Sequence, residues 1–311
     1  MEYKDFLCAT VFRLTNEIGD KADIDIYESL KNNGNLRKGI IIREKDKNIG
    51  PIIYMEEFYE RFNSGVSLDR IVNDVLGFYK KVRFNDNWKC DQIMEYQHIK
   101  DKLAVKLINY NKNKEYLRNY PHIRYLDLSI IFYVVLGMKD DGMATVVVTY
   151  DYMERWGISK AELLDQAVSN SCKILPAKFS SMQDMLEELM NDANIRDDIK
   201  DENKEIMYVL TNEHRNCGAA CILYRGILEM IGDILNKNFF IIPSSIHEVL
   251  IVPADRGVNP ANIDRIIDDV NEKYLSREEL LGNHCYIYDR ITKEVSFGYE
   301  WPEPLYNKTL L

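Results

Sequence analysis

The most regular pattern of apolar and polar positions in the chain lies between Ile206 and Asp255. The run Ile206–Leu210 has the length of a strand and stops at residues that favour turns. From Gly218 onward, apolar side chains recur at spacings of three and four, which predicts one helix that ends near Asn236. Its apolar positions are Ala219, Ala220, Ile222, Leu223, Ile227, Leu228, Ile231 and Leu235. The segment therefore predicts a strand, a turn marked by glycine, and a helix.

Two more strands follow this helix. Phe239–Ile242 and Val249–Val252 are short runs of β-branched and aromatic residues. Pro243 and Pro253 end them, because proline cannot donate a hydrogen bond to a central ladder. The turn between the strands consists of Ser244, Ser245, Ile246, His247 and Glu248. We expect this turn to be the polar tip of a rigid hairpin that is presented outward.

Helices and hairpins alternate along the rest of the chain. Amphipathic helices are predicted for Tyr3–Ile18, Tyr54–Phe62, Ser67–Tyr79, Ile93–Tyr110, Tyr152–Trp156, Ser159–Val168, Ser180–Met190 and a segment from Pro260 with an inner face of Ile263, Ile266, Ile267 and Val270. Hairpin turns are predicted at Asn32–Asn35, at Asp140–Gly142 between the strands Arg124–Leu136 and Ala144–Tyr150, and between Tyr286–Tyr288 and Val295–Phe297. Loops are predicted for Asn85–Asp91, the charged segment Asn191–Lys204 and the tail Glu300–Leu311, and a short helical turn is predicted for Ser276–Leu281.

Two parts of the chain share one order of elements: a hairpin, a short helix, a glycine and a helix capped by serine. Gly65 and Ser67 mark the joint in the first part, and Gly157 and Ser159 mark it in the second. An ancient ββαα duplication would produce this similarity. Chance would also produce it, because amphipathic helices draw on few residue types.

These elements predict an α+β fold in which antiparallel hairpins are packed by amphipathic helices, in two or three modules. A chain of 311 residues is long enough for two ordinary domains. We predict an N-terminal module over residues 1–120 and a C-terminal module over residues 121–311, with the loop 191–205 as an excursion from the second.

The composition is that of a globular protein, with 46% hydrophobic and 29% charged residues. The net charge of −10 argues against binding nucleic acid through a broad basic face, since phosphate contacts require clustered Lys and Arg. It also argues against attachment to anionic lipid. The charge leaves three alternatives open: a basic protein partner, a surface that imitates nucleic acid, and acidity that serves solubility alone.

The composition and the apolar runs also predict a cytoplasmic location. The first residues include acidic side chains and no long apolar region, so they do not resemble a secretory signal. The longest apolar stretch, Leu128–Met138, is far shorter than the roughly 18 residues of a membrane-spanning helix. The six cysteines are scattered, which favours reduced thiols in the cytoplasm. The pattern leaves the oligomeric state open.

Cys217 is the first candidate for chemistry. It precedes Gly218 at the predicted start of a helix, where a thiol pKa is lowered, and His214 or His247 could serve as its base. The spacing of His214, Cys217 and Cys221 offers three metal ligands, but a structural zinc site needs four, so we predict no metal. Unpaired cysteines are most often small buried residues, and we favour that structural interpretation.

The hairpin tip is the second candidate. Ser245, His247 and Glu248 supply a hydroxyl, an imidazole and a carboxylate, but residues within one tight turn rarely reach the geometry of a catalytic triad. Contact with a ligand or partner through Ser244, Ser245, His247 and Glu248 is the better-supported use of a polar tip on a rigid hairpin.

The remaining sequence contains no phosphate-binding loop, no dinucleotide-binding glycine motif, no zinc-protease motif and no calcium loop, so we predict no cofactor. Asp264, Asp268 and Asp269 are interpreted as a solvated helix face. Twenty tyrosines, many of them in the first half, suit a protein interface.

Several segments resemble a known family. IIYMEEFYERFNSGVSLDRIV, KLINYNKNKEYL, PHIRYLDLSIIFY, YVLTN, GAACILYRGILE and FFIIPSSIHEVLIVPAD are similar to a clostridial family known only as a domain of unknown function, number fifty-six eighty-eight. WGISKAELLDQAVSNSCKILP and the hairpin with His247 are more weakly similar to an uncharacterised bacillus conserved-hypothetical family. The resemblance implies an α+β fold and a cytoplasmic location. It implies no activity and no catalytic residue.

The sequence thus supports a non-enzymatic cytoplasmic protein that interacts with an unidentified protein partner or regulates it, with no role for nucleic acid or membrane. The alternative is a hydrolase or transferase that uses His247 with Ser245, Glu248 or Cys217. Coordinates separate the two hypotheses, because an enzyme requires His247 in a pocket within reach of a nucleophile and an orienting carboxylate.

Overall fold

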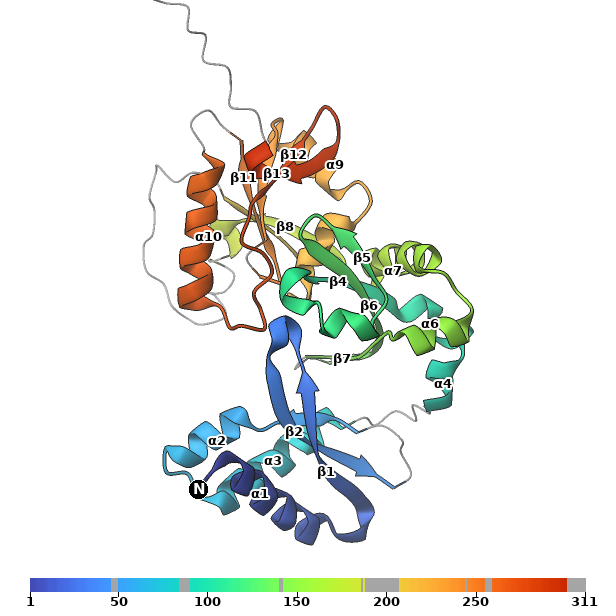
Figure 1. The fold of residues 1–311 in the computed structure, drawn as a ribbon, viewed down its shortest axis with the longest axis vertical. Coiled ribbons are helices and arrows are strands. Elements are labelled where there is room, and N and C mark those ends of the chain that lie inside the picture. The colour runs from blue at the N-terminus through green and yellow to red at the C-terminus, as the bar shows by residue number, and fades with distance from the viewer. Residues whose placement is uncertain are drawn as a thin grey trace, which may run out of the picture. The chain divides into compact units, whose positions relative to one another are not determined.

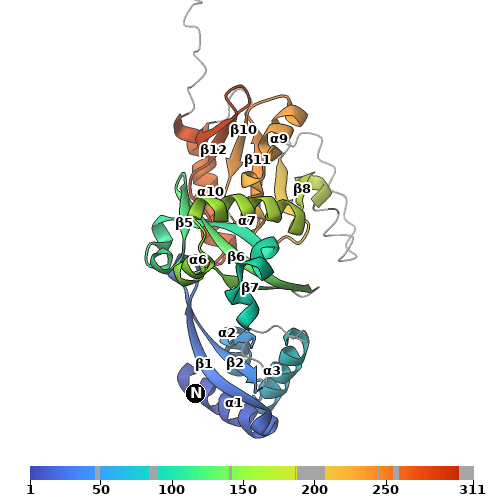
Figure 2. The same cartoon turned by 90° about the vertical axis from the view of Figure 1, so that its right-hand side faces the viewer.

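The computed structural model describes residues 1–45, 50–83, 90–139, 142–185, 187, 207–243, 245–254 and 259–300. The protein is α+β, as predicted: its strands form three antiparallel sheets that are packed by helices (Figures 1 and 2). By its contacts the chain divides into two compact units, Met1–Ile99 and Lys100–Leu311. No helix in the described ranges combines the length and apolar character that crossing a bilayer requires.

The first unit is a three-stranded sheet packed by three helices. Its elements are α1 (Tyr3–Ile18), β1 (Ala22–Leu30), β2 (Leu36–Glu44), β3 (Ile52–Tyr54), α2 (Glu56–Asn63) and α3 (Leu68–Val82), and the short helices α4 (Cys90–Met94) and α5 (Tyr96–Ile99) complete the unit. The sheet order is β1-β2-β3, and the long β1–β2 hairpin extends well beyond the helices (Figure 1). Phe6, Leu14, Ile40, Ile53 and Val75 form the centre of its core.

Local sequence signals account for most of this unit. The helix predicted for Tyr3–Ile18 is confirmed, as are the hairpin around Asn32–Asn35 and the capping of α3 by Ser67, whose hydroxyl accepts the Arg70 amide at 3.4 Å. The three-residue strand β3 was not predicted, because so short a run shows no periodicity. The predicted loop Asn85–Asp91 lies outside the described residues except for Cys90 and Asp91, which begin α4.

The second unit begins with a sheet of four strands. The strands are β4 (Leu103–Asn109), β5 (His122–Tyr125), β6 (Leu128–Lys139) and β7 (Gly142–Val147), and β6 pairs with each of the other three. The helices α6 (Tyr150–Trp156) and α7 (Lys160–Ile174) follow, and α7 packs against β4 (Figure 2). Ser159 and Glu162 form the capping box that starts α7.

Two predictions about this sheet are wrong. The segment predicted as a helix over Ile93–Tyr110 contains β4, which is buried at every position except Lys106 because it contacts both α7 and the 3₁₀ helix η6 (Gly218–Leu223). A strand buried on both faces has no alternation, so its periodicity does not distinguish it from a helix. The segment predicted as one strand over Arg124–Leu136 is two strands, β5 and β6, joined by a tight turn in which Leu126 has a φ of 54°.

The predicted module boundary at residue 120 lies inside this sheet. β4 precedes residue 120 and β6 follows it, yet the two strands pair from Leu103↔Val134 to Asn109↔Leu128. The division of the contacts after Ile99 keeps these partner strands together. The order of hairpin, short helix and capped helix occurs in both units, and the duplication stays a hypothesis.

The third sheet has six strands in the order β13-β12-β10-β11-β9-β8. Its strands are β8 (Ala177–Ser181), β9 (Tyr208–Asn212), β10 (Phe239–Ile242), β11 (Val249–Pro253), β12 (Tyr286–Asp289) and β13 (Glu294–Phe297). The helix α10 (Pro260–Tyr274) packs on Phe240, Ile242 and Ile287, while α9 (Ile227–Leu235) lies on the opposite face near Tyr288 (Figure 1). The strands predicted around residues 208–252 and the last hairpin are confirmed.

Four details of this region differ from prediction. The single helix expected from Gly218 to Asn236 is divided into η6 and α9 by Gly226, which has a φ of 77°. Ile266 is exposed instead of buried, and the side chain of Val270 is outside the description. The helix predicted for Ser180–Met190 starts later, because residues 180–181 belong to β8. Ser276–Leu281 is a turn and not a helical segment.

The charged segment predicted at Asn191–Lys204 and residues 301–311 of the tail lie outside the described residues.

Candidate functional site

The hairpin tip between β10 and β11 is bound to the loop that follows β9. The Thr211 hydroxyl donates a hydrogen bond to the His247 carbonyl at 2.7 Å, and the Ala219 amide donates to the Ile246 carbonyl at 3.2 Å. These bonds join segments more than 25 positions apart in the sequence, and they fix the tip against η6.

Gly218 makes this close approach possible. A Cβ atom at Gly218 would lie 2.3 Å from the Thr211 hydroxyl oxygen and 2.4 Å from the His247 carbonyl oxygen. Real Cβ atoms do not come so close, so a larger residue would force the loop and the tip apart. The glycine predicted to mark a turn therefore acts here as a contact point between two segments.

His247 and Cys217 do meet, but through the backbone. The Cys217 amide donates to Nδ1 of His247 at 3.3 Å. A neutral imidazole that accepts at Nδ1 carries its proton on Nε2. The Nδ1 lone pair of His247 is therefore occupied by a main-chain donor, so the neutral ring has no free lone pair with which to accept a proton as a general base.

Ser245 is sealed within the tip, which corrects the expectation of an outward hairpin end. Ser245 is 2% exposed, and its hydroxyl oxygen accepts a hydrogen bond from the backbone amide of His247 at 3.0 Å. Ser245 forms a β-bridge with Leu280, and the neighbouring Ile246 amide donates to the Glu279 carbonyl at 2.8 Å. Ser244 lies outside the described residues.

Glu248 is half-buried beside these groups. Burial raises the pKa of its carboxyl above the ordinary value, the hydrogen bond from Ser245 and the neighbouring His247 lower it, and Glu279 raises it again. Ser245, His247 and Glu248 are thus brought together as a folded turn. The serine hydroxyl is engaged by the His247 backbone and by Glu248 rather than by the His247 ring.

The thiols of this region are not activated. Cys217 has a φ of 54°, and burial raises the pKa of its thiol, which the Lys106 ammonium only partly offsets. Burial also raises the pKa of Cys221 to about 12, and this thiol donates to the Thr211 carbonyl. The lowered pKa expected for Cys217 at a helix start is therefore wrong, because desolvation outweighs the short 3₁₀ turn.

The histidines and cysteines of this loop do not form a metal site. Over the described part of the chain, no group of three or more His, Cys, Asp or Glu side chains is arranged to hold a metal ion. His214 is exposed, and its backbone amide donates a hydrogen bond to the side-chain oxygen of Asn212 at 3.1 Å.

Sequence reasoning missed the pairing of Asp264 with His284. One oxygen of Asp264 lies 3.0 Å from Nδ1 of His284, and the other accepts the Cys285 amide at 2.8 Å. The prediction that Asp264 belongs to a solvated helix face is therefore wrong, because both of its carboxylate oxygens contact other residues. The rings of Phe297 and Tyr299 lie edge-on to the imidazole, and burial together with Asp264 raises the pKa of Cys285 to about 12. No signal in the sequence links two residues 20 positions apart on different elements.

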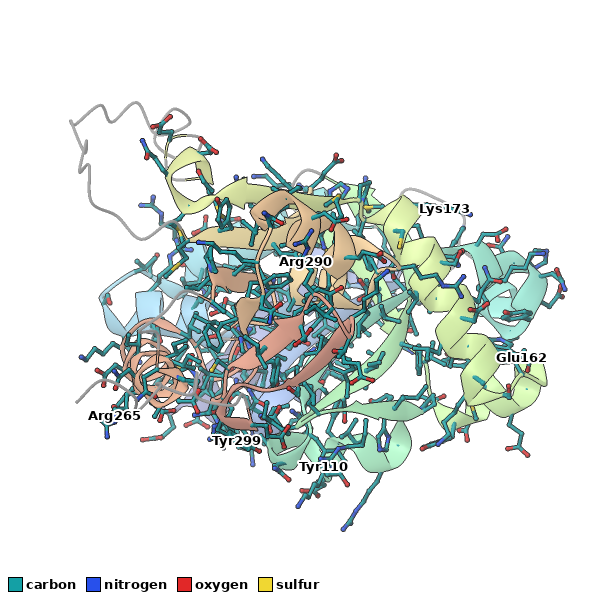
Figure 3. The ribbon with its side chains drawn as sticks, turned by 90° about the horizontal axis from the view of Figure 1, so that it is seen from above. Tyr110, Glu162, Lys173, Arg265, Arg290 and Tyr299 are labelled. Carbon is teal, nitrogen blue, oxygen red and sulfur yellow. The ribbon has the colours of Figure 1, made fainter. Side chains whose placement is uncertain are left out.

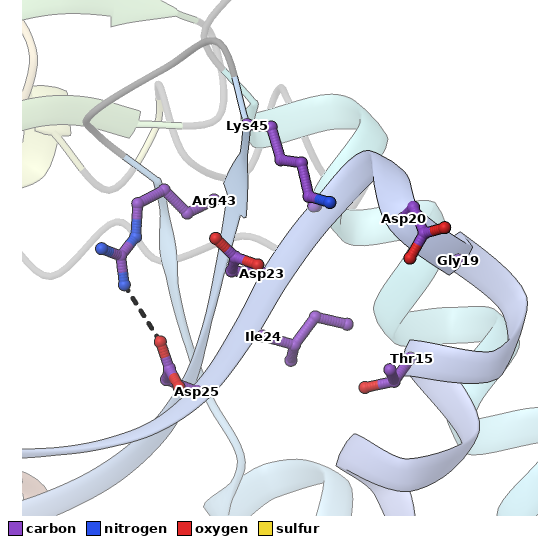
Figure 4. Close-up of a pocket in the computed structure, with 9 residues that line it drawn as sticks. Thr15, Gly19, Asp20, Asp23, Ile24, Asp25, Arg43 and Lys45 are labelled. Carbon is purple, nitrogen blue, oxygen red and sulfur yellow. Dashed lines mark hydrogen bonds and ion pairs between the residues drawn. The ribbon is translucent and has the colours of Figure 1, made fainter.

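A polar pocket of about 430 Å³ lies in the first unit, where α1 ends and β1 begins (Figure 4). Its lining consists of Thr15, Gly19, Asp20, Ala22, Asp23, Ile24, Asp25, Arg43 and Lys45. Arg43 lies 3.0 Å from Asp25, whereas Asp20 and Asp23 form no ion pair with any residue that the structure describes. Alternating Asp and Ile residues at 23–26 were interpreted only as a strand, so this pocket was not predicted.

An apolar surface on α9 is the other feature that was not predicted from the sequence. We name Met230, Ile234 and Ile291 the α9 surface; Ile234 is 60% exposed and Ile291 is 90% exposed. Ile291 belongs to the β12–β13 turn. In this turn Lys293 forms an ion pair with Glu229 of α9, and Arg290 forms an ion pair with Asp233 of α9 at 3.4 Å. Arg290 lies beside α9 in Figure 3.

The fold and these contacts define an antiparallel α+β protein in which the His247 ring and the Cys221 thiol form hydrogen bonds that connect the loop after β9 to its neighbours. The model of the family of unknown function DUF5688 matches residues 3–290, and the chain belongs to that family. Searches of curated proteins and of solved structures found no match.

Proposed function

We propose that this protein is a non-enzymatic, cytoplasmic protein that acts by binding a protein partner. The observation that supports this most directly is the α9 surface, where Met230, Ile234 and Ile291 are exposed beside a rim of ion pairs. An apolar centre with a charged rim is the usual composition of a protein interface. The ion pairs hold the β12–β13 turn against α9, so the apolar side chains are presented from a fixed scaffold.

The cytoplasmic location is supported by the cysteines. Cys8, Cys172, Cys217, Cys221 and Cys285 are all free thiols, which suits a reducing compartment. The clostridial origin and the bacillus similarity stay predictions.

The alternative of a hydrolase or transferase has less support. Nδ1 of His247 accepts a backbone amide, Ser245 is buried, and the thiol of Cys217 has a raised pKa. None of these three groups is poised for proton transfer or nucleophilic attack.

A matched pair of substitutions tests the proposal. Ile234→Glu places a carboxylate in the α9 surface, whereas Ile266→Glu places one on α10 at a residue with a similar exposure of 61%. The wild-type chain and both variants are used to capture partners from native cytoplasm, which are then quantified by mass spectrometry. We expect a partner to be retained by the wild type and by Ile266→Glu and to be lost about tenfold with Ile234→Glu, since a charge in an apolar interface core is unfavourable.

His247→Ala serves as the second variant. If the protein acts through the α9 surface, this substitution leaves capture unchanged, because His247 belongs to the brace on β10–β11. Capture that is unaffected by Ile234→Glu, or a wild-type chain that retains no partner, would contradict the proposal.

A further inference from the structure

The outer edge of β1 has a defined set of open backbone groups. Beyond the two ends of the β1–β2 ladder, the Lys45 amide donates to the Lys21 carbonyl at 3.2 Å and the Lys31 amide donates to the Asn35 carbonyl at 2.6 Å. The register between these points is continuous, from Ala22↔Glu44 to Leu30↔Leu36. In an antiparallel ladder, residues that exchange hydrogen bonds with the partner strand alternate with residues whose groups point away.

Odd-numbered residues of β1 therefore bond to β2, and even-numbered residues direct their amides and carbonyls outward. The hydrogen bond from the Met55 amide to the Lys38 carbonyl supports this alternation. It shows that even-numbered residues of β2 direct their backbone groups toward β3, which leaves the odd-numbered residues of β2 to bond to β1. The open positions of β1 are Ala22, Ile24, Ile26, Glu28 and Leu30. No strand in the described ranges pairs with them.

The side chains along this edge differ between the two faces of the sheet. Ile24 and Ile26 lie on the face that carries the core, and Ile26 is 41% exposed. Asp23 and Asp25 lie on the other face. Because side chains alternate along a strand, a segment added here would meet apolar side chains on one face and carboxylates on the other.

The pocket lies along the first half of the same edge. Residues 22–25 line it together with Thr15, Gly19 and Asp20, as Figure 4 shows. Its lining has three carboxylates and two cations, and one cation, Arg43, already pairs with Asp25. The pocket therefore favours a basic side chain.

We infer that the open edge of β1 binds an extended segment of a protein partner in which basic residues alternate with apolar residues. The segment adds a fourth strand by hydrogen bonding to Ile24 and Ile26, which is a known mode of peptide recognition. Its basic side chains lie beside Asp23 and Asp25. A second copy of this chain is the less favourable occupant, because two β1 edges would bring these carboxylates together.

This inference rests on the proposed function only in that the partner is a protein, and it uses a different surface from α9. The charged side chains of β1 also suit its position at the edge of the sheet, since charged residues on an edge strand prevent indiscriminate pairing with other strands. A partner with complementary charges overcomes that protection selectively.

The test uses the full chain and a blocked synthetic peptide of four Lys-Val repeats, with binding measured by calorimetry. The same peptide with Glu in place of Lys is the charge control. Ile26→Pro removes an outward amide without breaking any β1–β2 hydrogen bond, and proline is tolerated on such edges. Ile26→Thr keeps the amide and a β-branched side chain. We expect the Lys-Val peptide to bind the wild type and Ile26→Thr, and to bind Ile26→Pro about tenfold more weakly.

A charge exchange keeps the inference testable if Ile26→Pro does not fold. The double substitution Asp23→Lys with Asp25→Lys is expected to lose the Lys-Val peptide and to bind the Glu-Val peptide. Equal binding of the Lys-Val peptide to Ile26→Pro and Ile26→Thr would overturn the inference, as would no binding to the wild type. Self-association of the wild type that Ile26→Pro abolishes would identify a second copy as the occupant and would also overturn it. Ile234→Glu is expected to leave peptide binding unchanged, so failure here is distinguishable from failure of the α9 proposal.

Discussion

The backbone amide of Cys217 donates a hydrogen bond to Nδ1 of His247, 30 residues further along the chain. This bond joins the loop after β9 to the tip of the β10–β11 hairpin. Cys217 and His247, the residues that the sequence offered as nucleophile and base, therefore hold these two segments together.

Gly218→Ala is expected to destabilise the second unit by about 2–3 kcal/mol, because the added methyl group meets the Thr211 hydroxyl and the His247 carbonyl. Urea unfolding followed by circular dichroism measures the change. Gly137→Ala is the matched control in the same unit, since a Cβ there has no neighbour within 4 Å. Equal stabilities of the two variants would show that the close approach at Gly218 is not required.

His247→Ala is expected to cost about 1–2 kcal/mol of unfolding free energy, because it leaves the Cys217 amide without its acceptor. His247→Asn is expected to restore most of that loss, since its side-chain oxygen can occupy a position close to that of Nδ1. Chemical denaturation of both variants checks the prediction. A loss in His247→Asn as large as in His247→Ala would show that the hydrogen bond contributes little.

Glu248→Gln is expected to stabilise the protein at neutral pH. Burial raises the pKa of the Glu248 carboxyl above its ordinary value of 4.5, so the folded state binds this proton more tightly than the unfolded state. The wild type therefore loses stability as the pH rises from 4.5 through the raised pKa, and the variant lacks this loss. Unfolding free energies of both proteins between pH 4 and pH 7 should diverge as pH increases. A constant difference across this range would be incompatible with a raised pKa.

Thiol alkylation is expected to proceed in an order set by burial. Cys8 is exposed and should react with iodoacetamide first at pH 8. Cys221 and Cys285, whose pKa values are raised to about 12, should react only on unfolding, and Cys217 should react slowly because its pKa is raised as well. Mass spectrometry of time points identifies the modified residues. Rapid modification of Cys217 in the folded protein would contradict the raised pKa and would support the hypothesis that Cys217 is a nucleophile.

Elements whose signals are local were predictable. The helix Tyr3–Ile18 carries its apolar positions at helical spacing, the β1–β2 turn has Asn33 and Gly34 in left-handed conformations, and Ser159 with Glu162 forms a capping box. Each depends on contacts between residues a few positions apart, so the amino-acid order is sufficient to specify it.

Elements defined by burial on more than one side were not predictable. β4 reads as a helix because its apolar residues do not alternate, and only contact with α7 and η6 shows why they need not. The helix expected from Gly218 is divided because η6 packs against β9 and β4 before Gly226 allows the chain to turn.

By itself, the sequence determined the α+β class, the β1–β2 and β12–β13 hairpins and the helices capped by Ser67 and Ser159, since all of these follow from neighbouring positions. Only the tertiary structure decided what the side chains contact: the His247 ring meets a backbone amide, Asp264 meets His284, and Ile234 is exposed although Ile231 of the same helix is buried. The physical reason is that hydrogen bonding and burial depend on segments brought together from distant parts of the chain, and periodicity along one segment carries no information about its partners.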